Sequence, residues 1–457
     1  IVAIVLLLGA CIFFHETGHF VLAKLAGMLV HEFAIGFGPR LVSFKRGETL
    51  YSVRLVPLGG YVRIAGMDPE ERDAERGFHT FPRWQGFMVL VAGSVMNVVL
   101  AAVAFIAIAA VSGLPVFPDY TVRVSKVLPG GAAEAAGIQG GDEIVSVDGI
   151  SHSLFVEDVR SGGPAARAGI GANNLIYEVE EDGVTVPPEL LSAVQEHAGG
   201  SVRVEIAAYD AKGNINDLSS GLLRVPASVA EAQTAEAAAV VEKALGMTLA
   251  PLDRSATVRY ISDRPEQKVA LRVRREGRKF DVALTPRVEW ARVPTEDERG
   301  RLSSAHKEVG RIGVVLTGAR EPVGVGRAIV YGVEHSVGAV VMVSYGLAEM
   351  IRGKVAPQAS GPVGIAAMTA ERLRIGWTAV VQLLGIISAN LAVINLFPIP
   401  PFDGFRIALL GIEGVMGRRV DAKKELAVTI AGVALLLGLF LVITFRDILN
   451  LVFYSTP

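Results

Sequence analysis

Three long apolar segments constrain this chain more than any other feature of its sequence. They run from about 87 to 116, from 377 to 397 and from 426 to 445. A helix needs about 20 residues to cross the hydrocarbon core of a bilayer, and each segment is long enough. A mean hydropathy of +0.44 agrees with a chain that lies partly in lipid. We therefore expect an integral membrane protein.

The opening segment, residues 1 to about 27, is also apolar apart from a short polar group. With three spans elsewhere, a fourth membrane helix is favoured over a buried helix of a soluble protein. The chain starts at Ile1 inside this run, and we interpret the start as a trimmed N-terminus rather than a cleaved signal peptide. Cys11 is the single cysteine, which excludes an intrachain disulfide and a zinc site made of several thiolates.

Basic residues in two short connections orient the helices, because such connections are cytoplasmic. Both chain ends and residues 118–375 then lie outside. Residues 325–352 are amphipathic, which favours a helix on the outer surface over a fifth span. The formal net charge of -2 gives no electrostatic case for a nucleic-acid partner. The basic residues are Arg40, Lys45, Arg46, Arg54, Arg63, Arg72, Arg76 and Arg83 in the first connection, and Arg406, Arg418, Arg419, Lys423 and Lys424 in the second.

The opening helix carries the sequence HETGH from His15 to His19, an HExxH pattern. Residues four apart lie on one face of a helix, so both imidazoles can face one Zn²⁺ while Glu16 stands beside it. Ionisable side chains at this depth are costly unless something compensates them, and a metal ion does so. The alternative is a group of polar residues that line a water-filled cavity or a proton path.

A hydrolytic zinc site needs a third protein ligand and an open position for water. The best candidate is Asp403, because the third apolar segment ends in Pro398, Pro400 and Pro401 and the carboxylate follows at the cytoplasmic edge. The two histidines are expected at the same level. The alternative for Asp403 is a loop aspartate that caps the next helix.

A strand-like segment follows the opening helix. Residues 50–56 alternate like a strand, residues 57–60 indicate a turn, and residues 61–64 return. A membrane helix must unwind before its peptide bonds can be attacked. The returning strand, with Tyr61, Val62 and Arg63, could bind the unwound substrate as an added strand. An ordinary cytoplasmic hairpin is the alternative.

The outer region contains an imperfect repeat, GGAAEAAGI from Gly130 and GGPAARAGI from Gly162. Each copy indicates a turn, a short Ala-rich helix and a Gly cap, and it resembles the signature of bacterial PDZ domains. The copies are too close for two complete domains in succession, so we expect two PDZ units, one of them split or truncated, between 118 and 317. Their grooves could capture a peptide C-terminus, act as a size filter, or only pack over the entrance.

The combination of HETGH in a first apolar helix with NLFPIPPFDG at residues 395–404 resembles the site-2 protease family of intramembrane metalloproteases. The bacterial regulator-of-sigma-E protease branch is the most similar. Further matching motifs are GFGPRL at 36–41, PLGGYVRIAGM at 57–67 and SGPVGI at 360–365. The chain departs from the family pattern at Ser94, where Pro is usual, and at Phe405, where Gly is usual.

This resemblance implies that His15, His19 and Asp403 bind zinc and that Glu16 is the catalytic base. Asn395 would hold the substrate or the transition state, and we also count Asn97 among the substrate-binding residues. The implied substrates are single-span membrane proteins, such as an anti-sigma factor already trimmed outside, and remnant signal peptides. The implied location is the bacterial inner membrane, with the PDZ region in the periplasm. A non-catalytic PDZ membrane adaptor is the alternative function.

The expected fold is a polytopic α-helical membrane protein with four transmembrane helices, a membrane-associated β-hairpin and extracytoplasmic PDZ-type α+β domains. The expected divisions are 1–30 (first span), 31–86 (β-hairpin region), 87–117 (second span), 118–317 (PDZ region), 318–375 (surface helix region), 376–400 (third span), 401–425 (cytoplasmic loop with Asp403) and 426–446 (fourth span).

Overall fold

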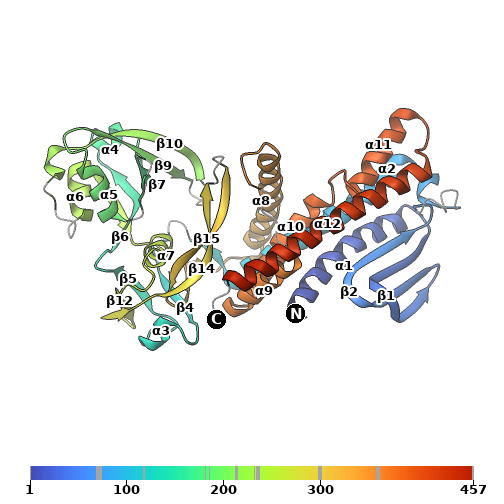
Figure 1. Cartoon of the computed structure of the whole chain (residues 1–457), viewed down its shortest axis with the longest axis horizontal. Helices are drawn as coiled ribbons and strands as arrows, with labels where there is room; N and C mark the ends of the chain where they lie inside the picture. The colour runs from blue at the N-terminus through green and yellow to red at the C-terminus, as the bar shows by residue number, and fades with distance from the viewer. Residues whose placement is uncertain are drawn as a thin grey trace.

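The computed structural model describes residues 2–67, 75–116, 119–180, 182–184, 186–210, 215–230, 232, 237–296, 301–356 and 361–454. Arg72 and Ser360, named above, lie outside the described residues. Long helices fill one half of the molecule and β-sheets fill most of the other half (Figure 1).

Within the described residues, five helices are long and apolar enough to cross a membrane: α1 (Val2–Leu25), α2 (Arg83–Ser112), α8 (Val325–Ile351), α10 (Trp377–Ile394) and α12 (Ala422–Tyr454). Four of them coincide with the predicted spans. The fifth is α8, for which the sequence predicts a helix on the membrane surface. Helix α8 runs across the direction of α1, α10 and α12, which lie nearly parallel to one another (Figure 1).

Glycine and proline mark the ends of the helices near the predicted site. Helix α2 stops at Gly113, whose φ of 74° is strained for other residues. The prolines after α10 lack the backbone N–H that a continuing helix needs, so the chain turns before α11 (Asp403–Met416) begins. Asp403 is therefore the first residue of a helix at the end of the proline segment.

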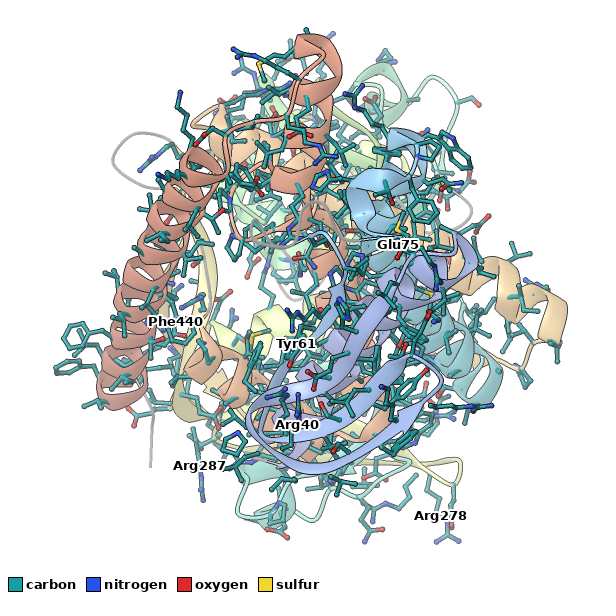
Figure 2. The ribbon with its side chains drawn as sticks, turned by 90° about the vertical axis from the view of Figure 1, so that its right-hand side faces the viewer. Arg40, Tyr61, Glu75, Arg278, Arg287 and Phe440 are labelled. Atoms are coloured by element: carbon teal, nitrogen blue, oxygen red, sulfur yellow. The ribbon has the colours of Figure 1, made fainter. Side chains whose placement is uncertain are left out.

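Small residues let the membrane helices approach closely. A Cβ atom at Gly18 of α1 would collide with the carbonyl of Ala92 in α2, and one at Gly385 of α10 would lie 2.9 Å from the ring of Phe105 in α2. Helix α12 packs loosely, since only 6% of its apolar window is buried. Figure 2 shows α12, with Phe440, set apart from the strands that carry Arg40 and Tyr61.

Two long strands, β1 (Val30–Arg46) and β2 (Thr49–Ile64), form a sheet beside α1. The turn between the two strands lies at 47–48, and residues 57–60, predicted to form a turn, are assigned to β2. The chain nevertheless reverses there as predicted, because residues 50–53 run parallel to residues 32–35 whereas residues 60–63 run antiparallel to them. Gly59, with a φ of 125°, bends β2 without ending it. Residues 32–35 take register partners in two parts of β2, at 50–53 and at 60–63.

The half of the molecule away from the long helices, residues 119–317, is called the outer half below. Its described residues form two large sheets, one inserted into the other in sequence, and the separate pair of β14 and β15. A five-stranded sheet has the order β13-β12-β5-β4-β16 and is built from residues 123–147 and 269–317. A six-stranded sheet, with the path β10-β9-β7-β6-β11 and β8 beside β7, is built from residues 152–251. The residues of the five-stranded sheet therefore flank those of the six-stranded sheet in the sequence, and the division into two units, one of them split or truncated, stays a prediction. The identity of the two units as PDZ domains stays a prediction.

The remaining elements are η2 (Phe78–Thr80), β3 (Leu114–Pro115), β4 (Arg123–Val127), α3 (Ala132–Ala135), β5 (Glu143–Val147), β6 (His152–Val159), α4 (Pro164–Arg167), β7 (Asn174–Val179), β8 (Asp182–Gly183), α5 (Pro187–Gln195), β9 (Ser201–Tyr209), β10 (Ile215–Arg224), η3 (Ala227–Val229), α6 (Ala237–Leu245), β11 (Met247–Pro251), α7 (Arg254–Ser262), β12 (Val269–Arg275), β13 (Arg278–Leu284), β14 (Arg287–Glu296), β15 (Leu302–Arg311), β16 (Val314–Thr317), β17 (Arg320–Glu321) and α9 (Pro362–Ile375). Strands β3 and β17 pair with each other. Strand β3 follows α2 and β17 precedes α8, so their pairing links the two chain segments that connect the outer half with the helices.

Candidate metal centre

His15 and His19 of α1 meet Asp403 of α11 at one point inside the helical half. The Nε2 atom of His15 lies 3.1 Å from Asp403 Oδ2, and that of His19 lies 3.2 Å from the same oxygen. The two Nε2 atoms are 3.2 Å apart. Among the described residues, these three form the one group of His, Cys, Asp and Glu that could hold a metal ion together.

The geometry of the three ligand atoms fits zinc. Four ligands placed tetrahedrally about Zn²⁺, at bonds of about 2.0–2.2 Å, lie about 3.3–3.6 Å from one another. The observed separations of 3.1–3.2 Å are close to these values. Asp403 Oδ2 is buried and makes no hydrogen bond within the described chain, which a cation at the centre of the triangle would compensate. An imidazole pair with one carboxylate is also a donor set that zinc hydrolases use.

Helix α2 shapes the side of the site opposite α1. Val89, Gly93 and Asn97 are spaced by four residues and share one face of α2. The carbonyl of Val89 accepts a hydrogen bond from Nδ1 of His19 at 2.8 Å, which leaves Nε2 of that ring for a metal. A Cβ atom at Gly93 would collide with both imidazole rings, so this position has to be glycine if the rings are to converge.

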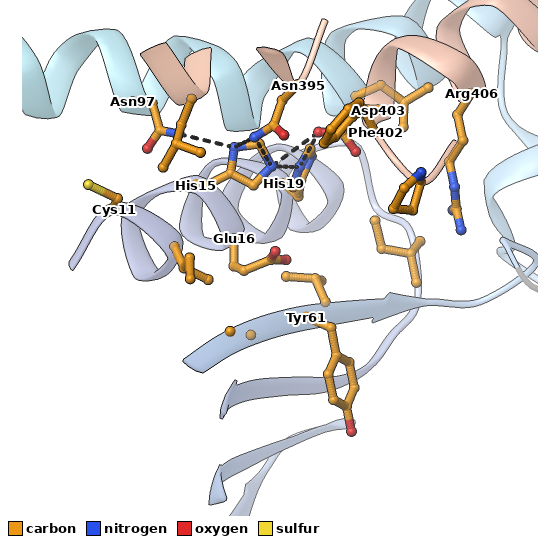
Figure 3. Close-up of a pocket in the computed structure, with 18 of the residues that line it drawn as sticks. Cys11, His15, Glu16, His19, Tyr61, Asn97, Asn395, Phe402, Asp403 and Arg406 are labelled. Atoms are coloured by element: carbon orange, nitrogen blue, oxygen red, sulfur yellow. Dashed lines mark hydrogen bonds and ion pairs between the residues drawn. The ribbon is translucent and has the colours of Figure 1, made fainter. Parts of the chain in front are cut away.

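Two asparagine side chains lie beside His15. Asn97 of α2 is fully buried, and its amide nitrogen lies 3.5 Å from Nδ1 of His15. Asn395, at the end of α10, places its amide nitrogen 3.3 Å from Nδ1 and 3.4 Å from Nε2 of the same ring. The two amides approach the ring from different helices (Figure 3).

A cavity of about 430 Å³ opens beside the three ligand atoms and is lined by α1, β2, α2, α10 and the start of α11, with Asn97 among the lining residues. Glu16 lines it and points from α1 toward β2 (Figure 3). A Cβ atom at Gly60 would lie 3.3 Å from Cγ of Glu16, so the glutamate sits directly against the backbone of β2. A group bound along β2 at this point would lie between the strand and the ligand atoms.

The predicted substrate-binding residues of β2 do not all face this cavity. Tyr61 and Val62 line it, but the ring of Tyr61 points away from the histidines (Figure 3). Arg63 is exposed and does not belong to the described lining of the cavity. Gly59 and Gly60, which have no side chains, also line the cavity, so part of its border along β2 is backbone.

The hydroxyl of Tyr61 belongs to a polar cluster around Glu32 in β1. Glu32 accepts hydrogen bonds from Ser52 at 2.7 Å, Arg54 at 2.9 Å, Tyr61 at 3.0 Å and Arg40 at 3.1 Å. Burial is the largest single influence and raises the pKa of Glu32, but the four donors outweigh it and lower that pKa to about 2. The cluster ties the two ends of β2 to β1 and so fixes the strand beside the cavity.

The two departures from the family motifs both fall within helices. Ser94 lies within the unbroken helix α2, and its hydroxyl is buried without a hydrogen-bond partner in the described residues. At the start of α11, a Cβ atom at Gly404 would collide with the carbonyls of Leu396 and Phe397, whereas Phe405 is half-buried in the next position. The close backbone approach thus depends on the glycine that is retained.

The sequence alone did not indicate the contact of His19 with Val89 or the part of Arg406 in the cavity lining. The spacing of Val89, Gly93 and Asn97 offers a signal for the first, since it predicts a common helix face. Arg406 follows Asp403 by three residues, so it shares that residue's side of α11.

Two histidines and a carboxylate, next to a glutamate and packed among apolar helices, form an arrangement that fits a metallopeptidase within a membrane. The sequence profile described as Peptidase family M50 matches residues 3–439, and the chain belongs to this family. It is accordingly a zinc-dependent metalloendopeptidase.

Similar proteins agree with this assignment over their full length. The zinc metalloprotease RasP of Oceanobacillus iheyensis is 28% identical over 468 residues, which cover 99% of both chains. The regulator of sigma-W protease RasP of Bacillus subtilis is 29% identical over 460 residues, or 99% of this chain and 98% of that protein. The probable protease eep of Enterococcus faecalis is 24% identical over 459 residues and 98% of each chain.

Proposed function

We propose that this chain is an intramembrane endopeptidase that cleaves single-span membrane proteins, with His15, His19 and Asp403 as its zinc ligands and Glu16 as its general base. The observation that carries the proposal is the convergence of the three ligand atoms, 3.1–3.2 Å apart, beside a cavity that Glu16 lines. Asp403 comes from a distant part of the chain, so the meeting is not a consequence of local helix geometry.

Zinc, when bound, lowers the pKa of a coordinated water and polarises the peptide carbonyl. Glu16 would accept the proton of the attacking water and donate it to the amine that leaves. Asn395, half-buried at the edge of the cavity, would donate an amide N–H to the developing negative charge on the carbonyl oxygen. Both groups act from fixed helices, which limits their reorganisation during the reaction.

The backbone of β2 would hold the substrate in an extended form. Residues 60–63 pair with residues 32–35 on one side and border Glu16 on the other. An unwound substrate segment could add to β2 there as a further strand and present its peptide bond to the site. Tyr61 and Val62 would contribute through their backbone groups, and Arg63 would lie outside the direct contacts.

The name of one similar protein and the position of the site among apolar helices support the proposed substrate class. One relative bears the name regulator of sigma-W protease. We extend this to a single-span anti-sigma-factor-like protein that another protease has already trimmed, and to remnant signal peptides, within regulated intramembrane proteolysis. A short remaining outer domain would be admitted past the outer sheets more easily than a bulky one.

The proposed topology has four crossings, with α1, α2, α10 and α12 in the bilayer of a bacterial inner membrane. Helix α8 would lie on the outer surface, and the two sheet units would be periplasmic PDZ domains. Exposed aliphatic side chains along α12 support contact with lipid, since a water-facing helix would carry polar groups there.

The test is Glu16→Gln in the full chain, reconstituted with a tagged single-span substrate. We expect no cleavage and unchanged zinc content, because the carboxylate is the base and not a ligand. His15→Ala should lose both zinc and cleavage. Glu157→Gln, an exposed glutamate of the outer half, is the matched control and should cleave normally. Undiminished cleavage by Glu16→Gln would contradict the proposal.

A further inference from the structure

We infer that Asn97 is a positioning residue, whose side-chain oxygen accepts a hydrogen bond from Nδ1 of His15 and so directs Nε2 of that ring to the metal. This inference rests on the proposed ligand role of His15. It differs from the sequence prediction, in which Asn97 binds substrate.

The two ring nitrogens of His15 have different surroundings. Its Nε2 atom faces Nε2 of His19 at 3.2 Å and Asp403 Oδ2 at 3.1 Å, so it is the nitrogen that would bind a metal. A neutral imidazole that binds through Nε2 carries its proton on Nδ1. That N–H is a donor in a buried place and needs an acceptor nearby.

Asn97 supplies such an acceptor if its side-chain amide is rotated by half a turn, which places the oxygen where the nitrogen lies. The amide nitrogen of Asn97 lies 3.5 Å from Nδ1, while its oxygen is buried and has no hydrogen-bond partner in the described chain. The oxygen and nitrogen of an amide are assigned from the hydrogen-bond network, and a rotation by half a turn exchanges them. After this exchange the oxygen of Asn97 faces the N–H of His15.

Asn395 is less suited to the same role. Its amide nitrogen is almost equidistant from the two ring nitrogens, at 3.3 and 3.4 Å, so it lies over the ring rather than in line with Nδ1. It is also half-buried at the cavity, where a substrate oxygen can reach it. Asn97 also borders the cavity, but it is fully buried, which suits a group that acts through His15 rather than on the substrate.

Neighbouring helices hold Asn97 in place. The hydroxyl of Ser388 in α10 donates to the backbone oxygen of Asn97 at 2.8 Å, and both residues are fully buried. Two turns earlier on α2, the backbone oxygen of Val89 accepts from Nδ1 of His19 at 2.8 Å. One face of α2 thus orients both histidines, His19 through a backbone oxygen and His15 through a side-chain oxygen.

The inference is tested by the zinc affinity of Asn97→Leu and Asn97→Asp in the full chain, measured by competition with a chelator. Leucine has a similar size but no acceptor, and we expect zinc binding to weaken about 10–100-fold, as is typical when the partner of a metal-binding histidine is removed. Aspartate keeps an acceptor and has no N–H, so it should bind zinc at least as tightly as the wild type. Val95→Leu, on the exposed face of α2, is the matched control and should leave the affinity unchanged.

Cobalt(II) in place of zinc adds a readout that does not depend on catalysis. Asn97→Leu should change the visible spectrum of the bound cobalt, and Asn97→Asp should retain a wild-type spectrum. A tenfold loss of zinc affinity in Asn97→Asp would overturn the inference, because it would show that the amide N–H is the required group. This variant decides the matter even if Asn97→Leu does not fold.

Failure of the inference is distinguishable from failure of the proposed function. If Asn97→Leu binds zinc like the wild type while His15→Ala does not, the role of Asn97 is wrong and the ligand set stands. If His15→Ala also binds zinc like the wild type, the proposed ligand set itself is wrong, and the inference about Asn97 falls with it.

Discussion

The helical half and the outer sheets bury their side chains in opposite ways. The core of the six-stranded unit consists of large aliphatic residues such as Leu154, Ile176, Leu190 and Ile206, each at most 1% exposed. In the helical half, the close contacts fall on glycines such as Gly18, while Leu439 of α12 is 51% exposed. Large apolar side chains therefore lie in the core of the six-stranded unit, whereas in the helical half they lie on the exposed surface of the helices.

The difference follows from the two surroundings. In water, burial of apolar surface drives large side chains into a core. In lipid this driving force is absent between helices, so small residues at the contacts give the closest packing and large apolar ones face the bilayer. The interior of the helical half is therefore the place where polar ligands from several helices can meet. A side chain added there should disturb function more than stability, and a side chain removed from the sheets should do the reverse.

The largest expected effect is that of Gly93→Ala. Its Cβ atom would collide with both histidine rings, so we expect loss of zinc and a fall in cleavage of at least about 100-fold, since misplacement of reacting groups by about 1 Å can cost that much. Zinc content and cleavage of a reconstituted substrate measure it. Gly9→Ala in α1, where a Cβ atom would meet nothing within 4 Å, is the control. Equal zinc content and equal cleavage in the two variants would contradict the claim that the site requires the absence of a side chain at Gly93.

An intermediate effect is expected from Leu190→Ala in the core of the six-stranded unit. Leu190 is fully buried, and such a truncation costs about 2–5 kcal/mol. Hydrogen exchange of residues 152–251 in the full chain should increase, while zinc content stays unchanged. The same substitution at Leu439 faces lipid and should change stability by less than about 0.5 kcal/mol. Comparable destabilisation by both would remove the contrast between the two halves.

The smallest effect is expected from Glu32→Gln in the β1–β2 sheet. Because the folded protein holds the pKa of Glu32 at about 2, below the ordinary value of 4.5, its charge stabilises the fold above about pH 4.5. That contribution declines as the pH falls toward 2. At pH 7 we expect a loss on the order of 1–3 kcal/mol, typical of hydrogen bonds to a charged group.

Thermal unfolding of Glu32→Gln and of the wild type, measured from pH 7 to pH 3, checks this dependence. The difference in unfolding temperature should be largest at neutral pH and should shrink on acidification. Glu157→Gln, whose side chain is exposed, is the control and should show a small difference at every pH. A difference that grows as the pH falls would contradict the assigned sign.

Regular periodicity made some features of the fold predictable and left others out of reach. The four apolar spans follow from patterns that are local in the sequence, and the structure has helices at these places. The chain reversal at 57–60 was also predictable, because Pro57 and the two glycines favour a change of direction. The sequence did not show that residues 32–35 lie between residues 50–53 and residues 60–63 and pair with both.

The candidate site also combines features that the sequence predicts with features that only the tertiary structure shows. HExxH on an apolar helix determines by itself that His15 and His19 share a face, because helix geometry is local. The sequence could name Asp403 only as a candidate, and it could not reveal that Val89 and Asn97 stand behind the two rings. Those contacts join α1, α2, α10 and α11, and the packing of glycines between the helices brings them together. Distances within a helix are set by its own hydrogen bonds, whereas distances between helices are set by tertiary packing, which involves residues far apart in the sequence.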